Sequence, residues 1–212
     1  MGDDPFPRRP AAAAWVARLI SHWASNEHIL GAIFCEAMGE AKHPAAAMYQ
    51  RLSNNSFMQI EVALAAILSE QPSEDVRLKY EGTIAYMKSI KGRRDRLAHW
   101  LYSSFSEEPD AVILIDPKHA LEHFFLSRGG NMLPLRKHAF IYGEKEFAEI
   151  YSEFQNVTKA LHILLEFGRN QDAATLSQLS SMPQIQRAID KILRGRNAQQ
   201  EHQEQPDKPL PA

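Results

Sequence analysis

The sequence predicts a mainly α-helical bundle that carries a small two-stranded β insert. Over residues 10–168, apolar positions recur mostly at spacings of three and four, the period of an amphipathic helix. This period is interrupted by AVILID at 111–116, a β-branched apolar run typical of a strand, and KHAFIY at 137–142 is a second candidate strand. Hydrophobic residues make up 44% and charged residues 24% of the chain, a balance that allows a buried core. We therefore expect one helical domain at 10–168 with the insert at about 109–142.

Short segments flank this domain. Residues 1–9 and 196–212 are polar or charged and contain several prolines, so neither can bury enough apolar surface to order itself. Both are expected to be disordered tails. Between the domain and the second tail, residues 169–195 contain a last amphipathic helix that is expected to dock loosely.

The first helix is expected to run from Pro10 to about Met38. Its core-facing positions alternate in spacing between three and four, and they are Val16, Ile20, Trp23, Glu27, Leu30 and Phe34. Glu27 is an acid within this otherwise apolar series. A carboxylate that packs against a neighbouring helix needs a partner, because burying an unpaired charge is costly.

The other helices follow from the same periodicity and from their first and last residues. A helix that begins near Pro72 is expected to continue past His99, and Gly92 weakens it by about 1 kcal/mol relative to alanine. A helix at 144–167 is expected to end at Gly168, since glycine commonly terminates helices. Shorter helices are expected at 44–52, 56–68 and 116–126.

The stretch KGRRDRLAHW at 91–100 surrounds one aspartate with cations and ends in a histidine and a tryptophan. On a helix, Asp95 and His99 are four residues apart and share a face, whereas Arg94 and His99 lie about 140° apart. Asp95 is therefore expected to hold the His99 ring and to leave its other nitrogen free for proton transfer. Arg94 is a planar donor suited to a phosphate group.

Arg-Asp-Arg-Leu-Ala-His resembles the R-x(4–6)-H signature of the HEPN family (higher eukaryotes and prokaryotes nucleotide-binding domains), with Arg94, Asp95 and His99 at the matched positions. The resemblance implies an all-α bundle in which two copies of the motif meet across a homodimer. It also implies metal-independent ribonuclease activity without a cofactor. In that mechanism His99 takes the proton of a ribose 2′-hydroxyl and Arg94 stabilises the charge that develops on the phosphate. Lys91, Arg93 and Arg96 are expected to position the RNA backbone.

A non-catalytic function fits the same residues. Glu27 is expected within salt-bridge reach of Arg94 or Arg96, and such a pair would make the motif a structural salt-bridge network. The protein would then be a dimerisation module, or a module that binds RNA or a nucleotide without cleaving it. The run of cations also fits a solvated basic helix face. The sequence does not identify a protein partner such as an antitoxin.

A second pattern, His119-Ala-Leu-Glu122-His123, matches the H-x-x-E-H arrangement of some zinc proteases. The expected helix there is short and no third ligand stands out downstream, so we expect no metal site. The single cysteine, Cys35, excludes an intramolecular disulfide and favours a reducing compartment, the cytoplasm. The formal net charge is −2, so any binding of nucleic acid has to depend on a local basic patch. No apolar run is long enough for a membrane span, and no membrane role is expected.

Overall fold

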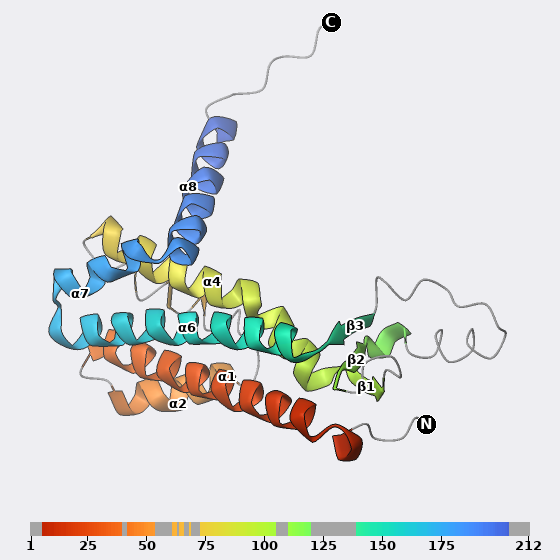
Figure 1. The fold of residues 1–212 in the computed structure, drawn as a ribbon. Helices are drawn as coiled ribbons and strands as arrows, with labels where there is room; N and C mark the ends of the chain where they lie inside the picture. The colour runs from red at the N-terminus through yellow and green to blue at the C-terminus, as the bar shows by residue number, and fades with distance from the viewer. Residues whose placement is uncertain are drawn as a thin grey trace, which may run out of the picture. The chain divides into compact units, whose positions relative to one another are not determined.

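The chain is described by a computed structural model that covers residues 6–39, 42–53, 61–62, 64–65, 68, 73–104, 110–119 and 139–203 (Figure 1). These residues are mostly helical and include a small antiparallel sheet, which confirms the predicted helical fold class. The helices are η1 (Phe6–Arg8), α1 (Pro10–Ala37), α2 (Lys42–Ser53), α4 (Glu74–His99), α6 (Glu144–Asn170), α7 (Ala173–Ser177), η4 (Gln178–Ser181) and α8 (Pro183–Gln203). The strands are β1 (Leu101–Ser104), β2 (Val112–Ile115) and β3 (Ala139–Tyr142).

The chain forms two compact units. The first consists of Met1–His28 and Ser89–Thr158, and the second of Ile29–Lys88 and Lys159–Ala212. Each of α1, α4 and α6 contributes one part to each unit. The candidate motif at the end of α4 and the whole β-sheet belong to the first unit.

In the first unit, α1 packs against the first half of α6 around a fully buried aromatic pair. The ring centroids of Trp23 and Phe154 are 5.1 Å apart, and both side chains are buried. Asn26, also buried, donates from Nδ2 to the Phe154 carbonyl at 3.2 Å and accepts from Thr158 Oγ1 at 2.6 Å. Thr158 Oγ1 also lies 2.9 Å from Nε2 of His22. These directional bonds fix the register of α1 against α6, which apolar packing alone would leave less defined.

The predicted core-facing series of α1 is largely correct. Val16, Trp23, Leu30 and Phe34 are buried, whereas Ile20 and Glu27 are only half-buried. The polar residue that α1 buries completely is Asn26, not Glu27. An amide at this position can be satisfied by neutral groups, so its burial costs less than that of a carboxylate.

The sheet has three strands in the order β1-β2-β3, all antiparallel, one more than the two that the sequence predicted. β2 and β3 are the two predicted strands, and β1 is the additional one. Tyr102 of β1 lies opposite Leu114, which in turn lies opposite Phe140 of β3. Leu114 is fully buried, so this face of the sheet contributes to the core of the first unit.

The helix α4 ends at His99. The sequence had predicted that it would continue past this residue. The chain turns at Trp100, whose amide still donates to the Arg96 carbonyl at 3.0 Å, and enters β1 at once. The Tyr102 hydroxyl donates a hydrogen bond to the Leu97 carbonyl. That carbonyl belongs to the last turn, where helix acceptors have no partner of their own, so strand pairing and this side chain together stabilise the helix end.

In the second unit, the first half of α4 packs closely against α8. The Cβ of an alanine at Gly82 would lie 2.5 Å from Cγ1 of Ile189, so the side chain of Ile189 would have to shift to accommodate it. Arg196 of α8 pairs with Glu81 at 2.6 Å and lies 3.8 Å from Glu74. The last helix is therefore held by apolar and ionic contacts to α4.

Several predicted boundaries differ from the structure. α8 extends to Gln203, so part of the predicted tail at 196–212 is helical, and in the predicted tail at 1–9 the ring of Phe6 packs 4.7 Å from that of Tyr102. α6 passes through Gly168 and ends at Asn170, and Gln171 takes the left-handed backbone conformation, φ 53°. The predicted helices at 56–68 and 116–126 lie mostly outside the described residues.

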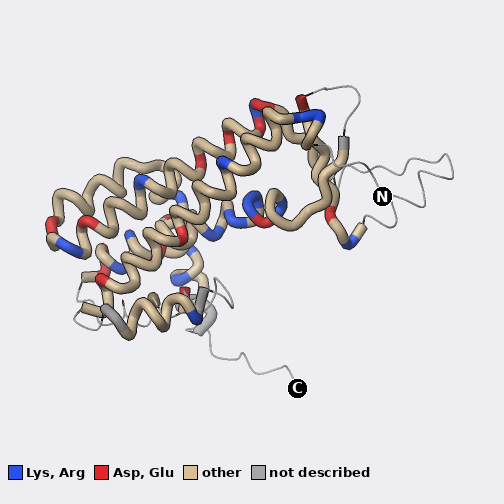
Figure 2. Tube along the Cα trace, turned by 90° about the horizontal axis from the view of Figure 1, so that it is seen from below, with Lys and Arg blue, Asp and Glu red and all other residues tan. Residues whose placement is uncertain are grey.

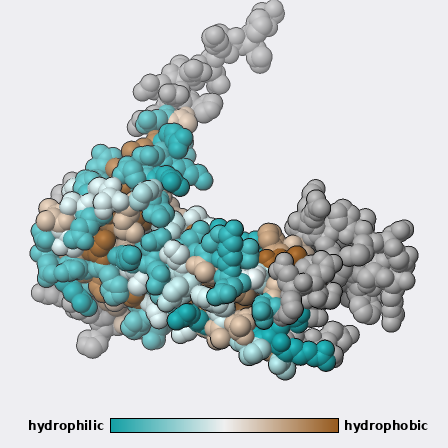
Figure 3. Space-filling view, viewed as in Figure 1, coloured by the Kyte–Doolittle hydropathy of each residue, from teal (hydrophilic) through white to brown (hydrophobic). Residues whose placement is uncertain are grey.

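Among the described residues, no helix combines the length and the hydrophobicity that crossing a membrane requires. On the face drawn in Figure 3, most of the described surface is hydrophilic, with small separate hydrophobic areas.

Candidate functional site

The candidate site lies on the last turns of α4, at the point where the helix meets the sheet. Arg96 and His99 stand in the final turn, where the carbonyl end of a helix favours cations. Positive and negative side chains occur along all the long helices, as the blue and red positions in Figure 2 show, so a count of charges does not mark the site. Its distinguishing features are the partners of each cation.

Asp95 is held by two cations of its own helix. Its Oδ2 accepts from Nζ of Lys91 at 2.5 Å, and its Oδ1 lies 3.3 Å from Nη1 of Arg94. The predicted hydrogen bond from His99 to Asp95 is not formed. Lys91 and His99 both lie four residues from Asp95, and the carboxylate pairs with the Lys91 ammonium, with which it forms a charge-assisted hydrogen bond.

Arg94 contacts His99 directly. Its Nη1 lies 3.4 Å from Nε2 of His99, which is exposed to solvent. Because arginine only donates hydrogen bonds, this contact requires an unprotonated Nε2, with the ring proton on Nδ1. The Nε of Arg94 is buried and has no hydrogen-bond partner among the described atoms. The structure thus brings Arg94 and His99 together although their spacing places them about 140° apart on a helix, and it is Arg94 that links Asp95 to His99.

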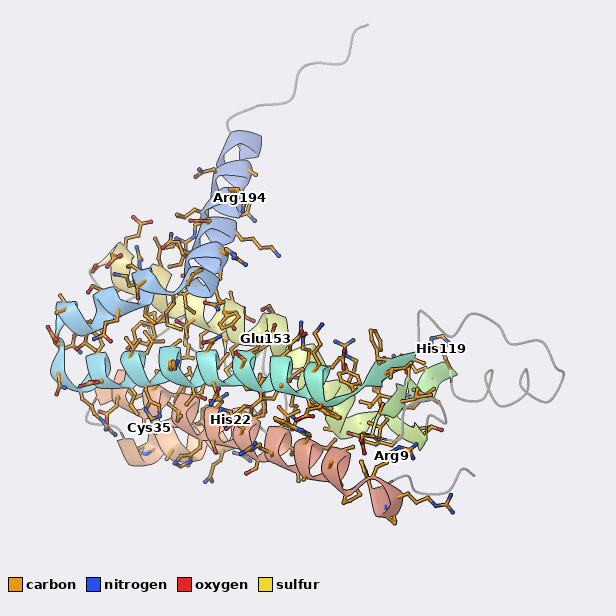
Figure 4. All side chains as sticks on the ribbon, in the orientation of Figure 1. Arg9, His22, Cys35, His119, Glu153 and Arg194 are labelled. Atoms are coloured by element: carbon orange, nitrogen blue, oxygen red, sulfur yellow. The ribbon has the colours of Figure 1, made fainter. Side chains whose placement is uncertain are left out.

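Arg93 forms an ion pair with an acid of the neighbouring helix. Its Nη1 lies 2.9 Å from Oε2 of Glu153, which projects from α6 (Figure 4). Burial raises the pKa of the Glu153 carboxyl above its usual range, and the charge of Arg93 opposes this shift. Arg93 therefore neutralises a carboxylate of the neighbouring helix, and its charge is only partly available to a ligand.

Arg96 packs on aromatic rings. Its guanidinium carbon lies 4.4 Å from the centroid of the Phe140 ring and 5.9 Å from that of Trp100, and the two rings are 5.6 Å apart. Phe140 is absent from the sequence-based site. It lies in a predicted strand, but its place over Arg96 depends on how β3 pairs with β2, which no local pattern reveals.

Glu27 does not form the expected ion pair with Arg94 or Arg96 among the described residues. Its Oε1 accepts from Nε1 of Trp23, one turn earlier on α1, at 2.8 Å. The indole of Trp23 is fully buried, and its N–H needs an acceptor, which Glu27 provides. Glu27 thus supports the tryptophan in the core.

No group of three or more histidine, cysteine or acidic side chains within the described part of the chain could hold a metal ion. Of the zinc-protease pattern, His119 is described, whereas Glu122 and His123 lie outside the described residues. Comparisons of the chain with protein families, with curated proteins and with solved structures found no match.

Proposed function

We propose that this protein cleaves RNA without a metal ion, with Arg94 and His99 as the reacting pair. The observation that carries the proposal is the 3.4 Å contact between Nη1 of Arg94 and Nε2 of the exposed His99. It joins an imidazole, which can accept a proton, to a permanent cation that suits a phosphate. The resemblance of this motif to the HEPN signature supports the same assignment.

In the proposed reaction, Nε2 of His99 accepts the proton of a ribose 2′-hydroxyl. The 2′-oxygen attacks the adjacent phosphorus, and the bond from phosphorus to the 5′-oxygen of the next nucleotide breaks. A 2′,3′-cyclic phosphate forms, and the departing 5′-oxygen takes up a proton. Arg94 stabilises the negative charge on the phosphoryl oxygens during this step. The reaction requires RNA, because DNA lacks the attacking hydroxyl.

The proton for the departing oxygen leads us to include dimerisation in the proposal. One motif supplies one imidazole, whereas acid and base on both sides of a phosphate call for two. A second copy of the chain that presents its own Arg94 and His99 would supply the second imidazole. We also place the protein in the cytoplasm, on the evidence of its single cysteine.

The test uses purified wild-type protein and mixed RNA in excess chelator. We expect cleavage by the wild type and a loss of about 10²- to 10⁴-fold in His99→Ala, because a proton-transfer group contributes about that much to rate. His162→Ala is the matched control, since His162 is likewise an exposed histidine on a helix. Absence of wild-type cleavage, or full activity of His99→Ala, would refute the proposal.

A non-catalytic binding or dimerisation module is the second candidate, and the ion pairs of Asp95 with Lys91 and Arg94 favour it. If these contacts serve stability alone, Arg94→Ala lowers the thermal midpoint and the wild type cleaves no RNA. If Arg94 serves the reaction, Arg94→Ala loses cleavage while the midpoint changes little, because the Arg94–Asp95 pair is long, at 3.3 Å, and Asp95 keeps its shorter contact with Lys91. Measuring both quantities on the same preparations decides between the two functions.

A further inference from the structure

Arg96, Trp100 and Phe140 form a cation–aromatic cluster beside His99. The guanidinium carbon of Arg96 is 4.4 Å from the Phe140 ring centroid and 5.9 Å from that of Trp100, and the two ring centroids are 5.6 Å apart. Arg96 is three residues before His99 and Trp100 directly follows it, so the cluster and the histidine share the last turn of α4 and its exit.

The partners of Arg96 set it apart from its neighbours. Lys91 and Arg94 pair with Asp95, and Arg93 pairs with Glu153. Among the described residues, Arg96 has no carboxylate partner and contacts two rings instead. Its charge is therefore not neutralised within the described part of the chain, while its plane is supported by an aromatic surface.

The cluster is also open to solvent on its aromatic side. Phe140 is 37% exposed although its partner on β2, Leu114, is fully buried. Trp100 and Arg96 are half-buried. The Phe140 ring and the Arg96 guanidinium therefore form an aromatic and cationic surface that a ligand can reach from solvent.

We propose that Arg96, Trp100 and Phe140 hold an unpaired base of single-stranded RNA next to the Arg94–His99 pair. This inference rests on the proposed function, because it adds a substrate subsite to the same reaction centre. Bases stack on aromatic rings and on guanidinium planes, and an arginine additionally attracts the neighbouring phosphate. A base inside a duplex is covered on both faces by its neighbours, so the cluster selects single-stranded RNA.

The experiment measures binding apart from cleavage. Full-length His99→Ala protein is titrated into a labelled single-stranded RNA of about 12 nucleotides, and separately into the same strand in a duplex, with fluorescence anisotropy as the readout. Arg96→Lys keeps the charge and removes the plane, and Phe140→Leu keeps an apolar side chain and removes the ring. Arg18→Lys is the matched control, because Arg18 also lies over rings, 5.4 Å from Trp15 and 5.0 Å from Tyr151.

We expect Arg96→Lys and Phe140→Leu each to weaken binding of the single strand on the order of tenfold, the scale of losing one stacked base. Arg18→Lys should bind like the parent, and Phe140→Tyr should restore binding, which separates loss of the ring from misfolding. The slope of affinity against salt should stay unchanged in Arg96→Lys, because the number of cations is conserved. The duplex should bind more weakly than the single strand.

Affinities of Arg96→Lys and Phe140→Leu within about twofold of the parent would overturn the base site, as would equal binding of the duplex. The proposed base-binding site would also be refuted if the His99→Ala parent binds no single-stranded RNA. Wild-type cleavage in chelator is measured in parallel, so the two proposals fail separately. Intact stacking without cleavage refutes only the reaction, and cleavage that is indifferent to the loss of Arg96 and Phe140 refutes only the base site.

Discussion

Nη1 of Arg93 lies 2.9 Å from Oε2 of Glu153 and joins α4 to α6 within the first unit. Both side chains keep roughly a third of their surface exposed, at 37% and 31%. Oε2 of Glu153 is itself buried and accepts no well-aligned hydrogen bond from the described residues. The pair is therefore close but poorly directed, and the charge of Arg93 only partly offsets the desolvation of the carboxylate.

Removal of the two partners is expected to have unequal effects. Arg93→Gln leaves the Glu153 carboxylate desolvated and unpaired, so we expect the free energy of unfolding to fall by about 1–2 kcal/mol. Glu153→Gln removes the charge that is costly to bury and leaves a guanidinium that water can reach, so the free energy should stay the same or rise. Urea unfolding near neutral pH measures both variants. A larger loss in Glu153→Gln than in Arg93→Gln would contradict this account.

The same carboxylate predicts a dependence of stability on pH. The pKa of Glu153 in the folded protein is raised above its usual value of 4.5, with burial as the main cause. As pH rises from 4.5, the unfolded chain loses this proton before the folded protein does, so the contribution of Glu153 to stability decreases until the folded pKa is passed. Below both values the two states are equally protonated and the effect is absent.

Glu153→Gln provides the measurement of this effect. The unfolding free energy of the variant minus that of the wild type should be smallest near about pH 4, should increase with pH, and should then level off. In an Arg93→Gln background the increase should extend to higher pH, because Arg93 lowers the pKa of Glu153. A difference that stays constant with pH, or that decreases as pH rises, would show that the pKa of this carboxyl is not raised.

Long-range pairing explains most of what the sequence did not predict about the fold. The helices α1, α4 and α6 were predictable because their apolar period repeats over more than twenty residues. β1, with the sequence LYSS, has no strong strand pattern of its own, and its conformation depends on pairing with β2. The close approach of α8 to Gly82 likewise depends on contacts with Ile185 and Ile189, which lie more than a hundred positions away in the sequence.

The sequence located the site on the last turns of α4 but did not predict the contacts within it. Spacing alone puts Arg94 and His99 about 140° apart on a helix, and the length of the arginine side chain allows its Nη1 to reach Nε2 of His99. Asp95, however, has Lys91 four residues before it and His99 four residues after it, and spacing alone gives both equal access. In the structure Asp95 pairs with the charged Lys91. Phe140 reaches Arg96 through the sheet register, so no inspection of α4 could have identified it.

Two glycines of α4 are expected to respond in opposite directions to alanine. At Gly82 the added Cβ would lie 2.5 Å from Cγ1 of Ile189 and 3.5 Å from the Ile185 carbonyl oxygen, so we expect a loss of about 1–3 kcal/mol. At Gly92 no atom lies within 4 Å of the added Cβ, so we expect stabilisation by about 0.5–1 kcal/mol from reduced backbone freedom. Thermal unfolding followed by circular dichroism compares the two. Equal stabilisation by both substitutions would show that α8 does not pack on Gly82 in solution.

Asp95 contacts Lys91 and Arg94, whereas the sequence predicted that it would hold His99, and these two roles predict different effects of Asp95→Asn. Because Asp95 accepts from Lys91 at 2.5 Å and lies 3.3 Å from Arg94, its carboxylate neutralises two cations that would otherwise face a phosphate. Asp95→Asn keeps an acceptor for Lys91 and removes the negative charge. We therefore expect tighter binding of single-stranded RNA at low salt. The dependence of log affinity on log salt should be steeper by about 0.7 for each additional phosphate that the protein neutralises.

The matched control is Asp75→Asn, because Asp75 pairs with Lys79 at 2.6 Å with the same four-residue spacing on the same helix, in the second unit. It should leave RNA binding unchanged. Binding is measured in the His99→Ala background so that no RNA is consumed. If Asp95 instead orients His99, as the sequence suggested, Asp95→Asn should reduce cleavage in an otherwise wild-type protein without changing affinity. A charge effect should steepen the salt dependence even where the histidine is absent, and an orienting effect cannot, because it acts only through the ring of His99.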